Sequence, residues 1–168
     1  MQTTTTPTKH DSEARKATID CLNDLIQLDY DAIQAYKQAI DKIDDPYARA
    51  DLIAFQGDHE RHITDLRQAV RSLGSAPERS GRDLKGILLE GLTALRAVTG
   101  DLGALRAMRL NEKLTNRAYD RALEVRLPGT TRDVVLRNRD DERRHLVSIE
   151  AHIERLSLAR ERLHRKPS

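Results

Sequence analysis

Residues of the kinds that bind metal ions occur twice in this chain, the second set 83 residues after the first. Each set holds a carboxylate, a tyrosine seven residues later and a histidine 33 residues after the carboxylate. The corresponding pairs are Asp29 and Glu112, Tyr36 and Tyr119, His59 and Glu142, and His62 and His145. Carboxylates and imidazoles are oxygen and nitrogen ligands of divalent metal ions. The repeat therefore predicts a two-fold metal site between two similar halves of the chain.

Apolar residues three and four positions apart predict the helices that carry these side chains. Pro46 suits a first helical turn, Gly74 suits the position after a helix end, and Thr131 is a candidate N-cap. Short loops join the first two helices and the last two, and a long connection with a short accessory helix at 83–98 joins the pairs. This connectivity is typical of an all-α four-helix bundle of two helical hairpins. The main helices are predicted at residues 12–43, 46–73, 101–126 and 131–164.

The six candidate ligands interrupt the apolar stripes of these helices, so we expect them to point inward. His59 and His62 are three residues apart, as are Glu142 and His145, and this spacing places both members on one helix face. Burying an unpaired carboxylate costs several kcal/mol, and three together repel one another. Bound metal ions would offset that cost. A hydrogen-bonded polar layer without metal is the alternative.

Two further aspartates are placed to support the histidines. Asp58 and Asp141 lie four residues before His62 and His145, respectively. We expect each aspartate to accept a ring N–H from that histidine and so to fix its tautomer. The two tyrosines of the repeat lie one level away and can donate to the carboxylates or to a bound ligand.

The composition fits one helical domain. The 168 residues include no tryptophan, one phenylalanine and four tyrosines, so the core must be mainly aliphatic. No apolar run approaches the roughly 20 residues that cross a bilayer, so no membrane is expected as a partner. We expect a disordered polar tail at residues 1–12 and the bundle at residues 13–164. Because the one cysteine, Cys21, cannot form an internal disulfide, we expect a reducing compartment, the cytoplasm.

Charge and motifs exclude several classes of function. The net charge of +2 favours no particular partner. The basic residues near the end of the last helix suit the negative end of its dipole, so nucleic acid is not an expected partner. The chain has no nucleophile elbow, phosphate-binding glycine loop or CxxC motif. Hydrolase and nucleotide-binding functions therefore have no support.

The ordered set of motifs resembles the ferritin-like di-iron carboxylate superfamily over residues 18–160, and most of all its small bacterial stress proteins. The matching elements are the Glu-x-x-His segment at 142–145 and the carboxylate–tyrosine pairs Asp29 with Tyr36 and Glu112 with Tyr119. The resemblance implies a ferritin-like four-helix bundle with a di-iron centre. The ligands that it implies are Asp29, His59, His62, Glu112, Glu142 and His145.

Two positions depart from the family pattern. Asp29 stands where the family usually has Glu, and His59 stands where the Glu-x-x-His of the second helix would place Glu. An alternative alignment puts Gln56 at that position, but His59 obeys the 83-residue offset. Three carboxylates and three imidazoles are expected to stabilise two ferric ions less well than four and two. Manganese or zinc, or a single ion, are therefore alternatives to two iron ions.

The resemblance implies an oxidoreductase of the ferroxidase or peroxidase type. Such a protein oxidises Fe(II) with O2 or peroxide in iron handling or stress defence, and Tyr36 or Tyr119 supplies an electron or a hydrogen bond. A non-redox zinc or manganese protein and a metal-free structural bundle are the alternatives. We also expect a homodimer, because the long connection is rather apolar. The residues that suggest this are Ile87, Leu88, Leu89, Leu92 and Leu95.

Overall fold

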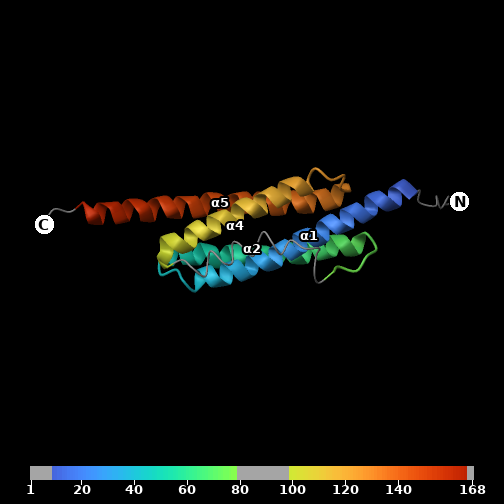
Figure 1. Cartoon of the computed structure of the whole chain (residues 1–168). Helices are drawn as coiled ribbons and strands as arrows, with labels where there is room; N and C mark the ends of the chain where they lie inside the picture. Colours follow the sequence, from blue (N-terminus) through green and yellow to red (C-terminus); the bar gives the residue numbers. More distant parts are fainter. Residues whose placement is uncertain (1–8, 79–98, 166–168) are drawn as a thin grey trace.

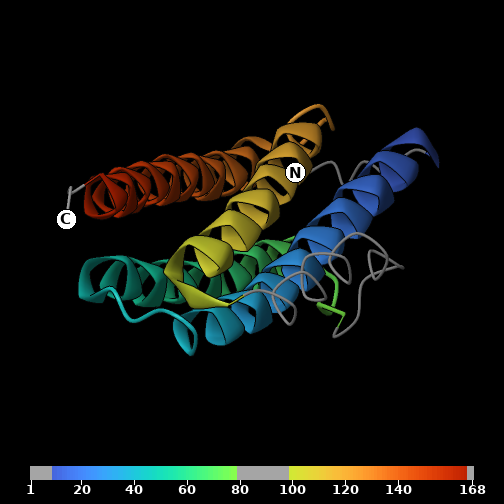
Figure 2. The ribbon, with the colours of Figure 1, turned by 60° about the vertical axis from the view of Figure 1, so that its left-hand side comes forward.

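Four long helices make up the parts of the chain that the computed structural model describes, residues 9–78 and 99–165. They form an all-α four-helix bundle of two antiparallel hairpins, as predicted (Figure 1). Figure 2 shows the α4–α5 hairpin lying over the α1–α2 hairpin. α1 packs against α2 and α4, and α5 packs against α4 and α2. The helices are α1 (Lys9–Ile40), α2 (Pro46–Ser72), α4 (Gly100–Ala122) and α5 (Gly129–His164).

The ends of α2 follow the predicted signals. Asp45 is the N-cap, and its side chain accepts a hydrogen bond of 2.8 Å from the backbone N–H of Ala48. Pro46 occupies the first helical turn, where its missing N–H leaves no bond unmade. Gly74 follows the helix with φ of 73°, a conformation in which a side chain would be strained. Asp45 and Pro46 therefore fix where the α1–α2 hairpin turns, and Gly74 marks where α2 ends.

Other helix ends differ from the predicted ones. α1 begins at Lys9 and ends at Ile40, three residues earlier than expected at each end. α5 begins at Gly129, so Thr131 lies inside the first turn and is buried instead of capping it. The loops that follow α1 and α4 contain apolar residues, which apolar periodicity alone cannot separate from a last helical turn. Residues 1–8 of the predicted tail lie outside the described residues.

The aliphatic core is divided into two clusters along the bundle. One cluster includes Leu22 and Leu66, and the other includes Leu52 and Met108, all 0% exposed. Between the two clusters, each helix carries the polar residues of the repeat. Each fully buried aliphatic side chain contributes about 1.5–3 kcal/mol. The two clusters therefore hold the helices in register around a polar layer.

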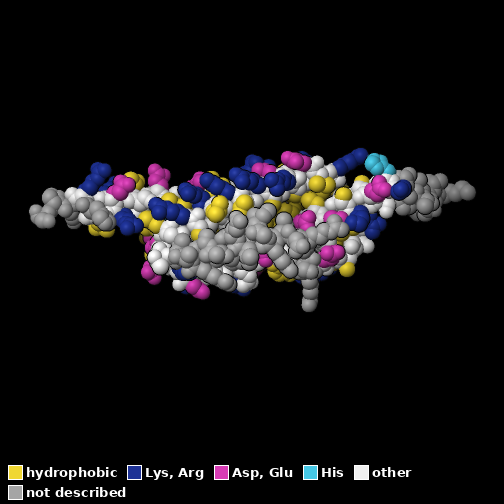
Figure 3. Space-filling model, in the orientation of Figure 1, with side chains coloured by type: hydrophobic (Ala, Val, Ile, Leu, Met, Phe, Trp, Pro, Cys, Tyr) yellow, Lys and Arg dark blue, Asp and Glu magenta, His cyan; other side chains and the backbone are white. Residues whose placement is uncertain are grey.

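The outer faces of the helices are highly charged. Figure 3 shows Lys and Arg side chains interspersed with Asp and Glu over the α4–α5 side of the molecule. Among the described residues, none of the helices has a stretch that is long and apolar enough to cross a bilayer. The predicted accessory helix at 83–98, including the apolar residues on which the predicted dimer rests, lies outside the described residues.

The Asp45 cap gives a direct test of the α1–α2 turn. Replacing Asp45 with Ala removes the bond to the Ala48 N–H and the ion pair with Arg155 (2.6 Å). We expect the free energy of unfolding in urea to fall by about 1–2 kcal/mol. Asp45→Asn keeps a capping oxygen and should lose less than about 0.5 kcal/mol, because Arg155 is half-exposed. Equal losses in the two variants would assign the effect to the ion pair instead of the cap.

Candidate metal centre

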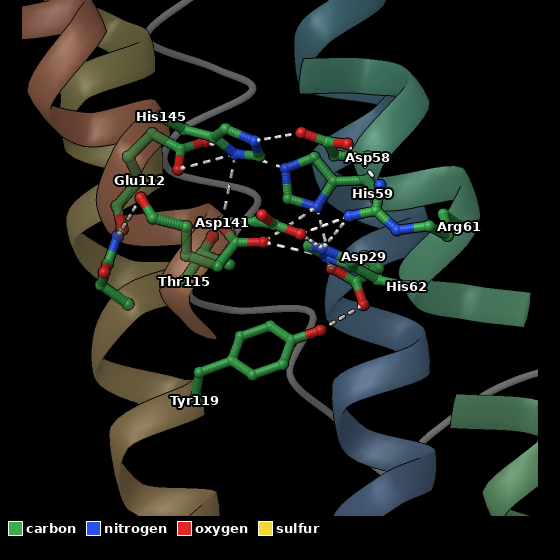
Figure 4. Close-up of polar contacts among 12 residues, drawn as sticks. Asp29, Asp58, His59, Arg61, His62, Glu112, Thr115, Tyr119, Asp141 and His145 are labelled. Carbon is green, nitrogen blue, oxygen red and sulfur yellow. Dashed lines mark hydrogen bonds and ion pairs between the residues drawn. The ribbon is translucent and has the colours of Figure 1, made fainter. Parts of the chain in front are cut away.

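The six candidate ligands meet at the centre of the bundle, and all four helices contribute. Their side chains are 0% exposed. Figure 4 shows those that it labels pointing toward one another between the helices. α1 and α4 each supply a carboxylate, α2 supplies two histidines, and α5 supplies a carboxylate and a histidine. The residues are Asp29, His59, His62, Glu112, Glu142 and His145. The structure therefore brings together every candidate ligand that the repeat singled out.

Two groups of four residues are each able to hold a metal ion. Within a group, one ligand atom of each residue lies within 4.8 Å of the ligand atoms of the others. We define position A by Asp29, His59, His62 and Glu142. We define position B by His59, Glu112, Glu142 and His145. Because His59 and Glu142 belong to both groups, the two positions are adjacent.

Several ligand atoms at this centre have no hydrogen-bond partner among the described residues. These atoms are His59 Nε2, His62 Nδ1, Glu112 Oε2, both carboxylate oxygens of Glu142, and His145 Nδ1. An unpaired buried polar group costs about 1–3 kcal/mol, and more when it is charged. Oxygen and nitrogen lone pairs that converge without protein partners are what a divalent metal ion binds. The residues present therefore fit a metal ion.

The three carboxylates respond differently to burial. Burial, together with repulsion from Glu112 and Asp29, raises the pKa of Glu142 to about 8. Burial also opposes ionisation of Asp29 and Glu112. For both, interactions with His59 outweigh burial and lower the pKa below its usual value. At neutral pH the metal-free centre therefore holds a proton on Glu142 and keeps the other two carboxylates ionised.

The three histidines also differ from one another. Burial disfavours the imidazolium form, but contacts with Asp29 and Glu142 outweigh it and raise the pKa of His62 to about 9. The pKa of His59 is raised well above its usual value for the same reason. Burial lowers the pKa of His145. The raised pKa values of His59 and His62 favour imidazolium rings, which offset the charge of the ionised carboxylates in the metal-free centre. Because a metal ion must displace protons from its ligands, loading of this centre releases protons.

Both tyrosines of the repeat donate hydrogen bonds to carboxylates of the centre. The Tyr36 hydroxyl donates to Glu112 Oε1 at 2.6 Å. The Tyr119 hydroxyl donates to Asp29 Oδ2 at 2.7 Å (Figure 4). Each tyrosine therefore serves the carboxylate of the opposite half of the chain. Burial raises the pKa of both tyrosines well above the usual value, so both stay protonated. In Glu112 and Asp29, one carboxylate oxygen accepts a hydrogen bond from a tyrosine, and this bond fixes the orientation of the other oxygen.

Asp58 and Asp141 support the histidines, but the predicted pairing is wrong. Asp58 accepts the hydrogen bond of His145 Nε2 at 2.9 Å, and Asp141 accepts that of His62 Nε2 at 3.1 Å. The partner lies on the opposite helix in both cases, and not four residues later on the same helix. The reason is that each histidine turns its Nδ1 toward the centre. Its Nε2 then faces the packed neighbouring helix, either α2 or α5.

Two arginines complete this arrangement at the surface, and we assigned them no role from the sequence. Arg61 donates to Asp58 at 2.5 Å and also to Asp141. Arg144 donates to Asp141 at 2.5 Å and to Asp58 at 2.8 Å. Burial opposes ionisation of Asp141, but the bonds from its histidine and the arginines outweigh it and lower the pKa to about 2. The signal was available, because Arg61 and Arg144 correspond under the 83-residue offset.

Other residues near the sequence motifs lie outside the centre or border it. The Gln56 side chain donates to Glu60 at 3.1 Å, so the alternative alignment that uses Gln56 as a ligand is not supported. Phe55 was not predicted as a site residue, yet its ring stacks on His145 with 4.2 Å between centroids. This contact depends on how closely α2 and α5 pack, and the spacing of residues along the sequence does not predict it.

Comparison with known proteins identifies a family without adding a function. The family model described as "Domain of unknown function (DUF2383)" matches residues 17–125, and the chain belongs to this family. The match covers most of α1 and all of α2 and α4, with their four candidate ligand residues. A search of curated proteins gives no match. The chemistry of the centre is therefore the evidence for the function of this protein.

The exchanged aspartate–histidine pairs can be tested by NMR. In Asp141→Ala, we expect the Nε2–H signal of His62 to be lost to exchange with water, because its acceptor is gone. The corresponding signal of His145 should persist, since Asp58 still accepts its hydrogen bond. Asp58→Ala should give the reverse pattern. Loss of the His145 signal in Asp141→Ala would show that histidine and aspartate pair within one helix after all.

The lowered pKa of Asp141 predicts how acid affects stability. A carboxyl with a folded-state pKa of about 2 stabilises the fold above its ordinary pKa of about 4. That contribution disappears as the pH falls through the folded-state value. We expect Asp141→Asn to lower the free energy of unfolding by about 1 kcal/mol at pH 6, a value reduced for contact with solvent. The difference should vanish near pH 2 in urea titrations, and a difference that is constant with pH would contradict this assignment.

Proposed function

We propose that this member of the DUF2383 family is a ferritin-like protein with a di-metal centre, and that the metal is iron. In this proposal, Asp29, His59, His62, Glu112, Glu142 and His145 hold the two ions. The protein oxidises Fe(II) with O2 or peroxide in iron handling or stress defence. The observation that carries the proposal is the set of converging buried ligand atoms that lack protein partners. Two adjacent positions that share ligands suit a pair of ions.

The charge of the centre supports two divalent ions. Three carboxylates offer three negative charges once Glu142 loses its proton, and two divalent ions carry four positive charges. A buried centre with nearly balanced charge avoids the large cost of burying an isolated charge. In the metal-free protein, protons on Glu142 and the histidines perform this neutralisation. The same residues can therefore remain buried with or without metal.

The surrounding residues prepare the ligands for binding. Asp58 and Asp141 hold the Nε2 hydrogens of His145 and His62, which leaves the Nδ1 lone pairs of both rings for metal. Iron bound there would supply redox chemistry with O2 or peroxide. We assign Tyr36 and Tyr119 the role of holding the carboxylates and of supplying a hydrogen bond or an electron to that chemistry. Their hydroxyls lie directly on Glu112 and Asp29.

One observation favours a second candidate function. His59 makes the ligand set richer in nitrogen than a centre with four carboxylates, and nitrogen-rich sites suit zinc. A non-redox zinc or manganese protein is therefore the alternative. A metal-free structural bundle is less favoured, because it would leave the unpartnered atoms of Glu142 and His145 without a purpose. Location in the cytoplasm and assembly as a homodimer remain part of the proposal.

Anaerobic titration of the metal-free protein with Fe(II) tests the proposal. We expect two equivalents to bind, and a ferric absorbance to develop when O2 or peroxide is added. Each bound ion should also raise the unfolding free energy by about 2.7 kcal/mol when free Fe(II) is 100 times the dissociation constant of that site. Elemental analysis of the purified protein and parallel titrations with Zn(II) and Mn(II) identify the preferred metal.

Variants separate specific binding from surface binding. Glu142→Gln should lose both ions, because Glu142 belongs to both positions. His152→Gln is the matched control, since His152 is another α5 histidine whose hydrogen bond goes to Asp51 outside the centre. Zinc binding with no oxygen-dependent change would favour the non-redox function. Failure of every metal to bind would exclude both functions in favour of the structural bundle.

A further inference from the structure

We infer that the two metal positions are unequal, and that His59 makes them so. In this inference, position A binds its ion with four protein ligands, and position B binds a second ion more weakly with three and keeps an open coordination position. The inference rests on the proposed di-metal function and adds to it the order of loading and the place where a small molecule can bind. It starts from the one ligand pair of the repeat that differs in chemical type, His59 and Glu142.

A carboxylate and an imidazole differ in what they can bridge. Glu142 has two oxygens, and both lack hydrogen-bond partners, so one can serve each position. A neutral imidazole has one ring nitrogen with a lone pair, because the other carries a hydrogen. His59 belongs to both groups of ligands, but its lone pair can serve only one of them. Four protein ligands at both positions together are therefore excluded while His59 is neutral.

The distances between ligand atoms place His59 at position A. Its Nδ1 lies 2.8 Å from Asp29 Oδ1 and 3.4 Å from Glu142 Oε1. The Nδ1 of His62 lies 3.7 Å and 3.2 Å from the same two oxygens. Metal–ligand bonds of about 2.1 Å in a tetrahedral site place ligand atoms about 3.4 Å apart. The four atoms of position A are already close to that spacing.

Position B is wider. His59 Nε2 lies 3.9 Å from Glu112 Oε1, and His145 Nδ1 lies 3.8 Å from Glu112 Oε2 and 3.9 Å from Glu142 Oε2. When His59 Nδ1 binds at position A, its Nε2 carries the hydrogen and faces Glu112. Position B then has Glu112, Glu142 and His145 as ligands. Three protein ligands with an open position are typical of catalytic metal sites, whereas four are typical of structural ones.

The surroundings of position B suit a small uncharged molecule at its open position. Phe55 stacks on the His145 ring, and the Tyr36 ring lies 5.2 Å from His59 between centroids. All of these side chains are buried. An apolar, aromatic border disfavours a charged ligand that would have to shed its water. Dioxygen has no such cost, and its chemistry is the one that the proposed function needs.

Titration with Co(II) tests the inference by spectroscopy instead of activity, because four-coordinate Co(II) absorbs more strongly in the visible than six-coordinate Co(II). We expect two resolved steps, the first from an ion held by four protein ligands and the second from an ion whose bands depend on what fills its open position. Loss of an outer partner alone costs about 10–100-fold in metal affinity, so the loss of a whole ligand should separate the steps by at least about 100-fold. Nitric oxide, an uncharged diatomic like dioxygen, should shift the bands of the second ion and leave those of the first unchanged.

Two substitutions of His59 give opposite expectations. His59→Glu restores a carboxylate that can bridge, so the two dissociation constants should approach within about tenfold. His59→Gln removes the imidazole, so the tight step should weaken by at least about 100-fold while the weak step stays nearly unchanged. His152→Gln should leave both steps as they are, and circular dichroism establishes whether each variant keeps its helices.

The outcomes distinguish this inference from the proposed function. Two equal steps that respond alike to nitric oxide would overturn the inference and leave the di-metal centre intact. Unchanged separation in His59→Glu would also overturn it. Unequal Co(II) steps without oxidation of Fe(II) by O2 or peroxide would support the inference and reject the redox function. Failure of Co(II) to bind at all would overturn both.

Discussion

The structure depends on one constraint, the burial of three carboxylates and three imidazoles in an otherwise aliphatic bundle. Such groups are stable inside a protein only when hydrogen bonds or opposite charges satisfy them. The outward-facing atoms are satisfied by Tyr36, Tyr119, Asp58 and Asp141, while the inward-facing atoms outside the His59–Asp29 pair have no hydrogen-bond partner. This division between satisfied and unsatisfied atoms is what separates a ligand-binding centre from an ordinary polar layer, in which hydrogen bonds close on one another.

The supporting bonds also hold the two hairpins together. Each tyrosine bond joins α1 to α4, and each aspartate–histidine bond joins α2 to α5. Bonds within one hairpin would not resist separation of the halves. Arg61 and Arg144 reinforce the α2–α5 contact, because each of them reaches an aspartate on both helices. The hydrogen bonds around the centre therefore join the two hairpins. The same bonds position the candidate ligands.

The sequence predicted the bundle and the candidate ligands, because both depend on periodicity that a linear pattern records. Asp29 and Glu112 could be recognised as inward-facing, since each interrupts an apolar stripe. Partners across the bundle could not be assigned in the same way. The spacing of Asp58 to His62 satisfies a one-turn contact as well as a contact with another helix, and only the direction of Nε2 decides between them. Both ends of α1, the end of α4 and the start of α5 were misplaced, because caps and loops there lack a strong sequence signal.

His59 is the one candidate ligand whose counterpart in the repeat, Glu142, differs in chemical type. A centre with Glu at both shared positions would carry four carboxylates, whose repulsion must be neutralised by metal or by protons. With His59, the metal-free centre instead pairs an imidazolium with Asp29 at 2.8 Å, which favours folding before metal arrives. The same substitution removes a negative charge that would stabilise highly charged ions. In the proposed di-metal centre, this one residue would shift the balance from tight holding of two oxidised ions toward stability without metal and easier release of the second ion.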